Sequence, residues 1–249
     1  MNKLYRRYKK WKNEKQLEYQ LKENNKKKIN FYSLFVKENS LCFDVGANIG
    51  NRVEPLLALK ARVVAIEPQE NCIIELERQF GDQIQIVKMG LGASVGIADF
   101  HISDASTLSS FSKDWIQSVQ EDRFKNYSWK SEIKVPITTL DKLIELYGIP
   151  EFIKIDVEGY ELEVLKGLSM PIRTISFEYT VPELLQSAKR GIEIIQNINP
   201  MIECNFSPDE SMRLYFKQWL TPHEMLEFID TTSFIDTTYG DIYCRTINY

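Results

Sequence analysis

The sequence predicts an α/β fold built on a seven-stranded, mostly parallel sheet, with an antiparallel last strand and helices on both faces. Short apolar runs alternate with amphipathic segments along most of the chain, which is typical of strands joined by helices. The first apolar run ends in a glycine-bearing turn at 46–50, and the second ends in an acid, Glu67. A strand, a tight glycine turn, a helix and a strand that ends in a carboxylate together form a nucleotide-binding half-unit.

Turn residues divide the chain into these elements. Pro55 is tolerated in the first turn of a helix, Gly81 ends a helix, Thr139 can cap one and Pro182 can open one. The seven strands are expected at 41–45, 63–66, 84–87, 152–157, 174–178, 201–206 and 241–247, with a further short strand at 96–101. The helices are expected at 31–36, 52–59, 71–80, 140–147, 162–168, 182–197 and, briefly, from 221.

Residues 1–30 form a basic arm that we expect to be helical, followed by a single domain over 31–249. The arm holds eleven Lys or Arg and three Glu, a balance of +8, so the rest of the chain carries −12. Leu4, Tyr8 and Trp11 could share one helical face. The arm could therefore lie on an anionic membrane or polyanion, or it could be a solvated helix that packs a few aromatic side chains on the domain.

Residues 103–132 are polar, serine-rich and only weakly periodic, so we expect a lid-like excursion over the carboxyl edge of the sheet. Its aromatic side chains, Trp115, Phe124, Tyr127 and Trp129, favour an ordered segment that is partly helical near 115–123.

The turn after the first strand indicates which ligand the half-unit binds. It lacks both a second glycine two residues after Gly46 and a Gly-Lys-Ser/Thr sequence, so neither a dinucleotide nor a triphosphate is expected. Glu67 can accept hydrogen bonds from two ribose hydroxyls, and Asp44 suits a cationic amino acid moiety. Together with Asn48 and Gly50, these residues predict a site for S-adenosylmethionine.

A second acidic group follows the fourth expected strand. Asp156 and Glu158 reach the end of that strand, and an acidic helix start with Glu161 and Glu163 comes next. The two helix glutamates can be explained by the helix dipole. Asp156 is different, because a carboxylate within an apolar strand is costly to bury without a partner or a task.

The segments 43–50, Glu67-Pro68, 139–141 and 154–167 resemble the FkbM family of S-adenosylmethionine-dependent methyltransferases over about 41–178. The resemblance implies a class I methyltransferase Rossmann-like fold and methyl transfer to a hydroxyl oxygen, typically of a sugar or a polyketide-type natural product. It also implies that Asp44 to Gly50 hold the methionine part of the cofactor, and that Glu67 with Pro68 hold the ribose.

Three side chains are candidates for catalysis. Asp156, which could also touch the cofactor, and Glu178 should flank the transferred methyl group, and either could be the general base. Together they could instead hold a divalent cation, which hard oxygen ligands favour. His101 could serve as the base or be structural, while Ser106 and Glu158 are expected to contact the substrate.

Other functions are open at this stage. A non-catalytic S-adenosylmethionine-binding scaffold, or a methyltransferase that reaches nucleic acid through the arm, would fit parts of the pattern. The −12 charge of the domain argues against nucleic acid, and the missing Gly-x-Gly-x-x-Gly argues against a dehydrogenase. A small-molecule or glycan acceptor is expected.

The cysteines and the hydropathy suggest a compartment. Four widely spaced cysteines and the absence of an apolar run of about 18 residues favour the cytoplasm, with contact at the inner membrane face as an option.

Overall fold

The computed structural model describes residues 3–247, and for residues 3–11, 13, 14, 17 and 18 it describes the backbone alone. Its centre is a seven-stranded sheet with the strand order β3-β2-β1-β7-β8-β10-β9. The strands β3, β2, β1, β7 and β8 run parallel to one another, whereas β10 runs antiparallel to both β8 and β9. The predicted mostly parallel sheet with an antiparallel last strand is therefore confirmed.

The bounds of the elements follow the expected pattern closely. The strands of this sheet are β1 (Leu41–Val45), β2 (Arg62–Ile66), β3 (Ile84–Val87), β7 (Phe152–Ile155), β8 (Thr174–Thr180), β9 (Ile202–Pro208) and β10 (Tyr239–Thr246). The helices are α1 (Lys3–Tyr32), α2 (Val53–Ala58), α3 (Glu70–Phe80), α4 (Lys113–Val119), α5 (Leu140–Tyr147), α6 (Glu161–Lys166), α7 (Leu185–Ile198), α8 (Pro222–Ile229) and α9 (Thr232–Ile235). Thr139 caps α5 as expected, while α7 begins three residues after Pro182.

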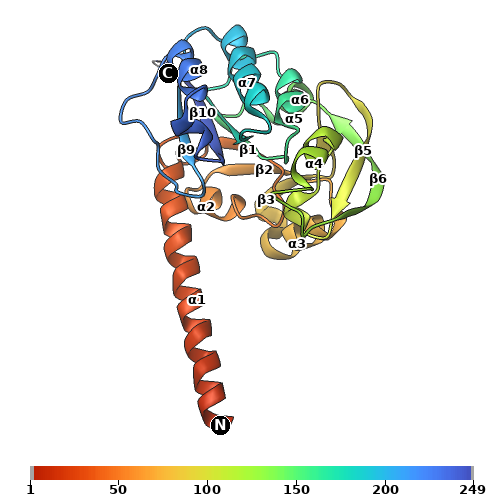
Figure 1. The fold of residues 1–249 in the computed structure, drawn as a ribbon, viewed down its shortest axis with the longest axis vertical. Coiled ribbons are helices and arrows are strands. Elements are labelled where there is room, and N and C mark those ends of the chain that lie inside the picture. Colours follow the sequence, from red (N-terminus) through yellow and green to blue (C-terminus); the bar gives the residue numbers. More distant parts are fainter. Residues whose placement is uncertain (1–2, 248–249) are drawn as a thin grey trace.

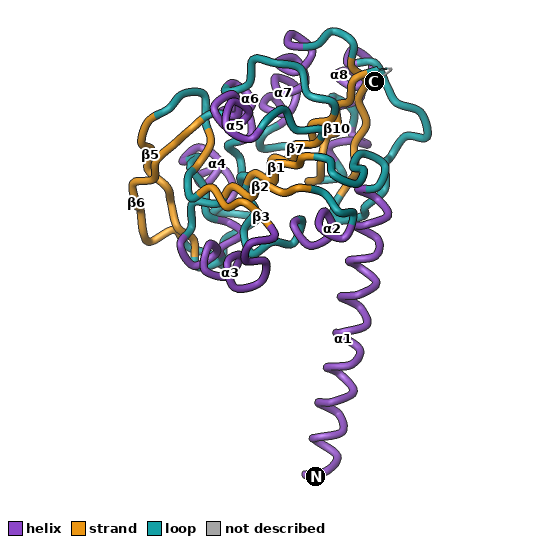
Figure 2. Tube along the Cα trace, turned by 180° about the vertical axis from the view of Figure 1, so that it is seen from behind, coloured by secondary structure: helices purple, strands orange, loops and turns teal. Residues whose placement is uncertain are grey.

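Helices cover both faces of the sheet, as Figure 2 shows from behind. On one face, Phe31 of α1, Leu56 of α2 and Leu76 of α3 pack into a single buried cluster. On the other face, a larger cluster joins α5, α6, α7 and α8 to the sheet. Because successive strand residues point to opposite faces, Cys42 lies in the first cluster and Phe43 in the second.

The excursion contains more regular structure than the sequence indicated. Residues 129–132 are not loop: they begin β6 (Trp129–Thr138), which pairs with β5 (Gly96–Ser103) and β4 (Gly90–Leu91) in a separate three-stranded sheet. The first half of β6 is exposed and partly charged, so it carries no apolar run to reveal a strand. The helix expected near 115–123 is α4, and its Trp115 is buried in a small cluster of its own.

Helix α1 continues beyond the expected end of the arm and leaves the rest of the molecule as a long projecting helix (Figure 1). A separate short helix at 31–36 is therefore wrong: α1 runs through Tyr32, and the buried Phe31 and Tyr32 fix its last turn to the domain. The proposed face of Leu4, Tyr8 and Trp11 lies outside the side chains that the structure describes. Within residues 3–247, no helix combines the length and the apolar character that a bilayer crossing needs.

A buried lysine ties the centre of the sheet together. Lys154 on β7 is fully buried, and its Nζ atom lies 2.7 Å from Oδ1 of Asp241 on β10 and 3.1 Å from Oδ2 of Asp156. It also donates to the carbonyl oxygen of Ile155 at 3.3 Å. Burial favours the neutral amine, but the two carboxylates hold the pKa of Lys154 well above its usual value, so it remains a cation.

Gly50 allows the turn after β1 to pack against α3. Its φ is +92°, which an L side chain rarely adopts, and a Cβ atom there would lie 2.2 Å from the Phe80 ring. The glycine therefore serves the packing of α3 on the first turn of the fold.

We expect Gly50→Ala to lower the free energy of unfolding by roughly 1–3 kcal/mol, since it adds backbone strain to an overpacked contact. Gly96→Ala is the matched control, because its Cβ would meet no atom within 4 Å. Denaturant unfolding of both variants measures the effect, and equal stability would contradict this assignment.

Lys154→Met should cost about 3–5 kcal/mol of stability, because it leaves two carboxylates without their buried cation. The loss should shrink as the pH falls, since unpaired carboxylates become neutral on protonation. Adding Asp241→Asn should restore much of the stability, because it removes one of the two stranded charges. Unfolding measurements on the single and double variants test this, and additive losses would show that the two charges do not interact.

Candidate active site

A cavity of about 350 Å³ lies at the carboxyl ends of β1, β2, β7 and β8. This edge is where open α/β sheets bind ligands, because the turns that follow parallel strands meet there. The predicted side chains that line it are Asn48, Glu67, Pro68, Ser106, Asp156, Glu158 and Glu178, together with the backbone of Gly46. Most of the candidate residues predicted from the sequence therefore lie in one cavity.

Gly46 brings the turn after β1 into close contact with the end of β7. Its φ is +82°, and a Cβ atom would lie 1.8 Å from the carbonyl oxygen of Asp156. The N–H groups of Gly46 and Ala47 both donate to the carbonyl of Ile66 on β2. Any larger residue at position 46 would force the turn after β1 away from the end of β7.

Glu67 is fixed at the end of β2 by two backbone hydrogen bonds. Its Oε2 accepts from the N–H of Asn48 and its Oε1 from the N–H of Gln69, both at 2.8 Å. Burial raises the pKa of Glu67, and these two donors oppose that rise. Each carboxylate oxygen keeps a second lone pair, so the group can still accept hydrogen bonds from a ligand.

Two residues predicted to hold the cofactor do not line the cavity. Asp44 is 1% exposed, and its Oδ2 has no hydrogen-bond partner among the described residues. Its side chain points to the face of the sheet that α1 and α2 cover, and burial raises its pKa to about 7. Gly50 instead packs against α3, so direct cofactor contacts through either residue are not supported.

Three carboxylates meet at the floor of the cavity. Asp156 and Glu158 follow β7, Glu178 belongs to β8, and one oxygen of each lies within 4.8 Å of the others. Like charges this close cannot all stay ionised. The three carboxylates have different surroundings, and their pKa values differ accordingly.

Lys154 selects the group that keeps its charge. Burial alone would favour the neutral acid, but the Lys154 ammonium holds the pKa of Asp156 below its ordinary value. Burial, and then the negative charge of Asp156, raise the pKa values of Glu178 and Glu158 well above theirs. Asp156 is thus a fixed anion, whereas Glu178 and Glu158 take up a proton more readily than ordinary glutamates.

Glu161 organises the turn that presents Glu158. Its Oε1 accepts from the N–H groups of Val157 at 3.0 Å and Gly159 at 3.2 Å. Ser110 donates at 2.6 Å to the carbonyl of Glu158, whose φ is +54°. Glu161 therefore does more than complement a helix dipole, because it holds the acidic turn in shape.

Ser106, which the sequence predicts to contact the substrate, lies beside the residues that hold Glu67. Asn48 Nδ2 donates to its hydroxyl at 3.4 Å, and Gln69 Nε2 donates to its carbonyl at 3.0 Å. These contacts place Ser106 beside the turn after β2, which favours a contact with the cofactor over one with the substrate.

His101 does not reach the cavity. It lies on β5, where neighbouring side chains point in opposite directions, and Phe100 is the one that lines the cavity. His101 instead lines a separate hollow beside α4, with Nδ1 3.2 Å from Oε2 of Glu132. The proposed role as catalytic base is therefore not supported by its position.

Several residues that line the cavity carry no recognisable signal in the sequence. Lys28 comes from α1, Arg52 precedes α2, and Glu210 comes from the loop after β9. Phe111 lies in the excursion. Each is brought in by tertiary packing and belongs to no recognisable motif.

Solved structures match the chain only at low similarity. A precorrin-6y C5,15-methyltransferase from Geobacter metallireducens has a TM-score of 0.45 and 8% identity, covering 88% of this chain and 84% of that one. Fibrillarin from Aeropyrum pernix, solved with S-adenosyl-L-methionine bound, has a TM-score of 0.43 and 10% identity over 84% and 68% of the two chains.

Sequence comparison is more specific. The hexuronic acid methyltransferase AglP from Haloferax volcanii is 28% identical over 174 residues, 64% of this chain. The chain spans 66% of the length of that curated relative. The family described as the methyltransferase FkbM domain matches residues 44–230, a segment that contains Glu67 and all three carboxylates of the cavity floor. The chain belongs to the FkbM methyltransferase family.

Proposed function

We propose that this chain is an S-adenosylmethionine-dependent O-methyltransferase that acts on a hydroxyl of a sugar, a glycan or a related natural product. The observation that carries the proposal is the combination, in one cavity, of a fixed carboxylate at the end of β2 and a cluster of carboxylates at the ends of β7 and β8. The first suits a nucleoside, and the second suits a cation and a reacting hydroxyl.

The residues present fit S-adenosylmethionine. A cavity of about 350 Å³ is within the usual range for small-molecule sites. The free lone pairs of Glu67 can accept from both ribose hydroxyls, and the Gly46 turn leaves backbone close to the ligand. The ionised Asp156 supplies negative charge that favours the cationic sulfonium.

The acids divide the work of methyl transfer between them. When bound, the cofactor supplies a methyl group already activated on a positively charged sulfur. Asp156 remains ionised beside Lys154 and stabilises positive charge, but its lowered pKa makes it a weak proton acceptor. Glu178, whose pKa is raised, is the better general base once it has lost its own proton, and it takes the acceptor's hydroxyl proton as the oxygen attacks.

A divalent cation is the alternative use of the same cluster. Three carboxylates with oxygens within 4.8 Å of one another could hold a hard cation, which would acidify the acceptor hydroxyl in place of a base. Both versions keep Asp156 and Glu178 at the reaction centre.

The relative's name supports a carbohydrate acceptor. AglP is named for methylation of a hexuronic acid, and it is 28% identical to this chain over 174 residues. We also propose a reducing, cytoplasmic location, which Cys204 and Cys244 support: their sulfurs face each other at 3.6 Å across β9 and β10 as free thiols.

Glu178→Gln should reduce kcat by about 100-fold or more while leaving S-adenosylhomocysteine affinity nearly unchanged, because it removes a proton acceptor and keeps the shape. In the parent enzyme, activity should fall as the pH falls through the raised pKa of Glu178, since the protonated acid cannot act as a base. This fall in activity at low pH should be absent from the Glu178→Gln variant.

The assay is methyl transfer to a panel of sugars, with calorimetry for cofactor binding. Glu163→Gln, on the exposed side of α6, is the control. Full turnover by Glu178→Gln would exclude Glu178 as the base. Loss of activity on chelation, with recovery when Mg²⁺ is added, would assign the carboxylate cluster to a cation. Cofactor binding without transfer to any acceptor would favour a non-catalytic scaffold.

The projecting α1 supports peripheral contact with an anionic membrane surface as part of this proposal. Residues 1–30 of the chain carry a balance of +8, and most of the length of α1 lies away from the domain (Figure 1). The full chain should co-sediment with vesicles containing phosphatidylserine at low salt, and less at high salt. Equal binding to neutral phosphatidylcholine vesicles would contradict this part.

A further inference from the structure

Two cations line the cavity in addition to the acidic floor. Lys28 lies near the end of α1, and Arg52 lies directly before α2. Both line the same cavity as Asp156 and Glu178. The cavity therefore holds two cations and Glu210 in addition to the carboxylates at the ends of β7 and β8.

Arg52 already engages a carboxylate of the cavity. Its guanidinium binds Glu210 through both terminal nitrogens, with Nη1 2.9 Å from Oε2, and its side chain is only 12% exposed. A planar fork of this kind fits a carboxylate in two-point contact. Glu210 comes from the loop after β9, so the pair also closes that loop over the cavity.

Lys28 has hydrogen-bonding capacity left over. In the described part of the chain, its ammonium makes one hydrogen bond, a long one of 3.4 Å to the carbonyl oxygen of Asn51. An ammonium has three donors. Lys28 is half-buried and lines the cavity, so its other two donors can reach a ligand held there.

The charges around Lys28 leave it short of a counterion. Burial and the neighbouring Arg52 lower its pKa, whereas Glu210, Glu54 and Asp44 oppose that change. Glu210 is committed to Arg52, Glu54 is exposed, and Asp44 is buried with a pKa raised to about 7. An additional anion beside Lys28 and Arg52 would relieve the repulsion between the two cations.

We propose that Lys28, beside the Arg52–Glu210 pair, is the binding site for a carboxylate group of a ligand held in this cavity. The inference rests on the proposed function, because that function offers two sources of such a group. One is the methionine carboxylate of the methyl donor, and the other is the carboxylate of an acidic sugar acceptor. In either case α1 contributes to the site through Lys28 and does not only extend from the domain.

The donor arm of the test compares ligands that differ in one carboxylate. Calorimetry would measure the affinity of the full chain for S-adenosylhomocysteine and for its decarboxylated analogue, which keeps the adenosine, sulfur and amine. If the donor is the source, the parent protein should favour the carboxylated ligand by about tenfold or more, the size of a charge-assisted hydrogen bond. Lys28→Met should lose that preference.

The acceptor arm uses methyl β-D-glucuronide and methyl β-D-glucoside, with S-adenosylhomocysteine present and binding followed by NMR. If the acceptor is the source, the parent should favour the glucuronide by a similar factor, and Lys28→Met should not. The two arms thus distinguish the two sources of the carboxylate.

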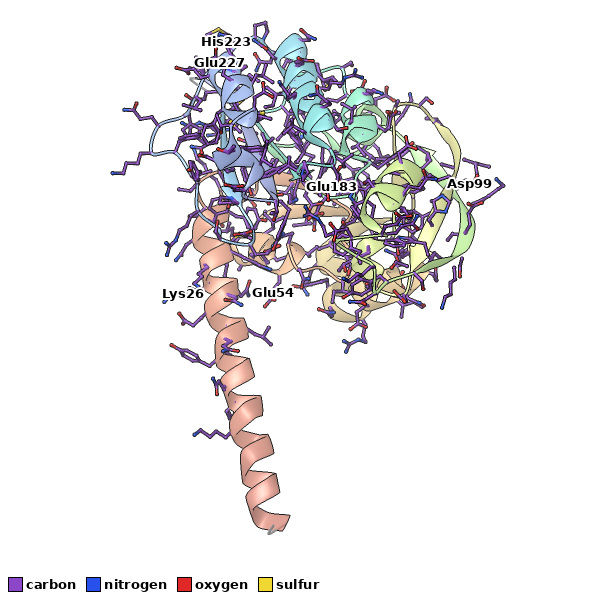
Figure 3. The ribbon with its side chains drawn as sticks, in the orientation of Figure 1. Lys26, Glu54, Asp99, Glu183, His223 and Glu227 are labelled. Carbon is purple, nitrogen blue, oxygen red and sulfur yellow. The ribbon has the colours of Figure 1, made fainter. Side chains whose placement is uncertain are left out.

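Two further variants separate charge from folding. Lys28→Arg keeps the cation and should retain the preference, whereas Lys26→Met removes a charge from the same helix outside the cavity and should have no effect (Figure 3). Lys28→Met that discriminates as the parent does in both arms would overturn the inference. Failure of the parent to bind S-adenosylhomocysteine at all would instead contradict the proposed function.

Discussion

Lys154 carries a full charge at the centre of the sheet, and the arrangement of the site depends on it. Its ammonium contacts Asp241 on β10 and Asp156 after β7, so it joins the antiparallel edge of the sheet to the floor of the cavity. A buried cation is tolerable only with its counterions in place. The position of Asp156 is therefore imposed by the interior of the fold and does not require a ligand.

This constraint also sets the charge of the cavity floor. Burial, together with the charge of Asp156 that Lys154 maintains, drives the neighbouring Glu158 and Glu178 toward their neutral forms. Glu158 and Glu178 can therefore exchange a proton, whereas Asp156 beside them stays ionised. Lys28 also lines the cavity and supplies positive charge beside the Arg52–Glu210 pair. A ligand with a cationic sulfur and an anionic end would match both kinds of charge.

The sequence predicted the sheet and much of the site because both follow from local signals. Apolar runs mark the strands, and Glu67, Asp156 and Glu178 lie at strand ends that must converge on one edge. What failed depends on packing. The direction of Asp44 and His101 is set by strand alternation against neighbouring elements, Gly50 serves α3, and the exposed β6 has no apolar run. Lys28 and Glu210 reach the cavity from opposite ends of the chain, which no motif records.

The central claim is that one cavity holds the nucleoside at Glu67 and the reaction centre at Asp156 and Glu178. A crystal structure of the chain with S-adenosylhomocysteine tests it most directly. We predict ribose hydroxyls within hydrogen-bond distance of the Glu67 carboxylate, and the ligand sulfur facing the three carboxylates. A nucleoside bound elsewhere, or a sulfur turned away from Asp156 and Glu178, would contradict the account.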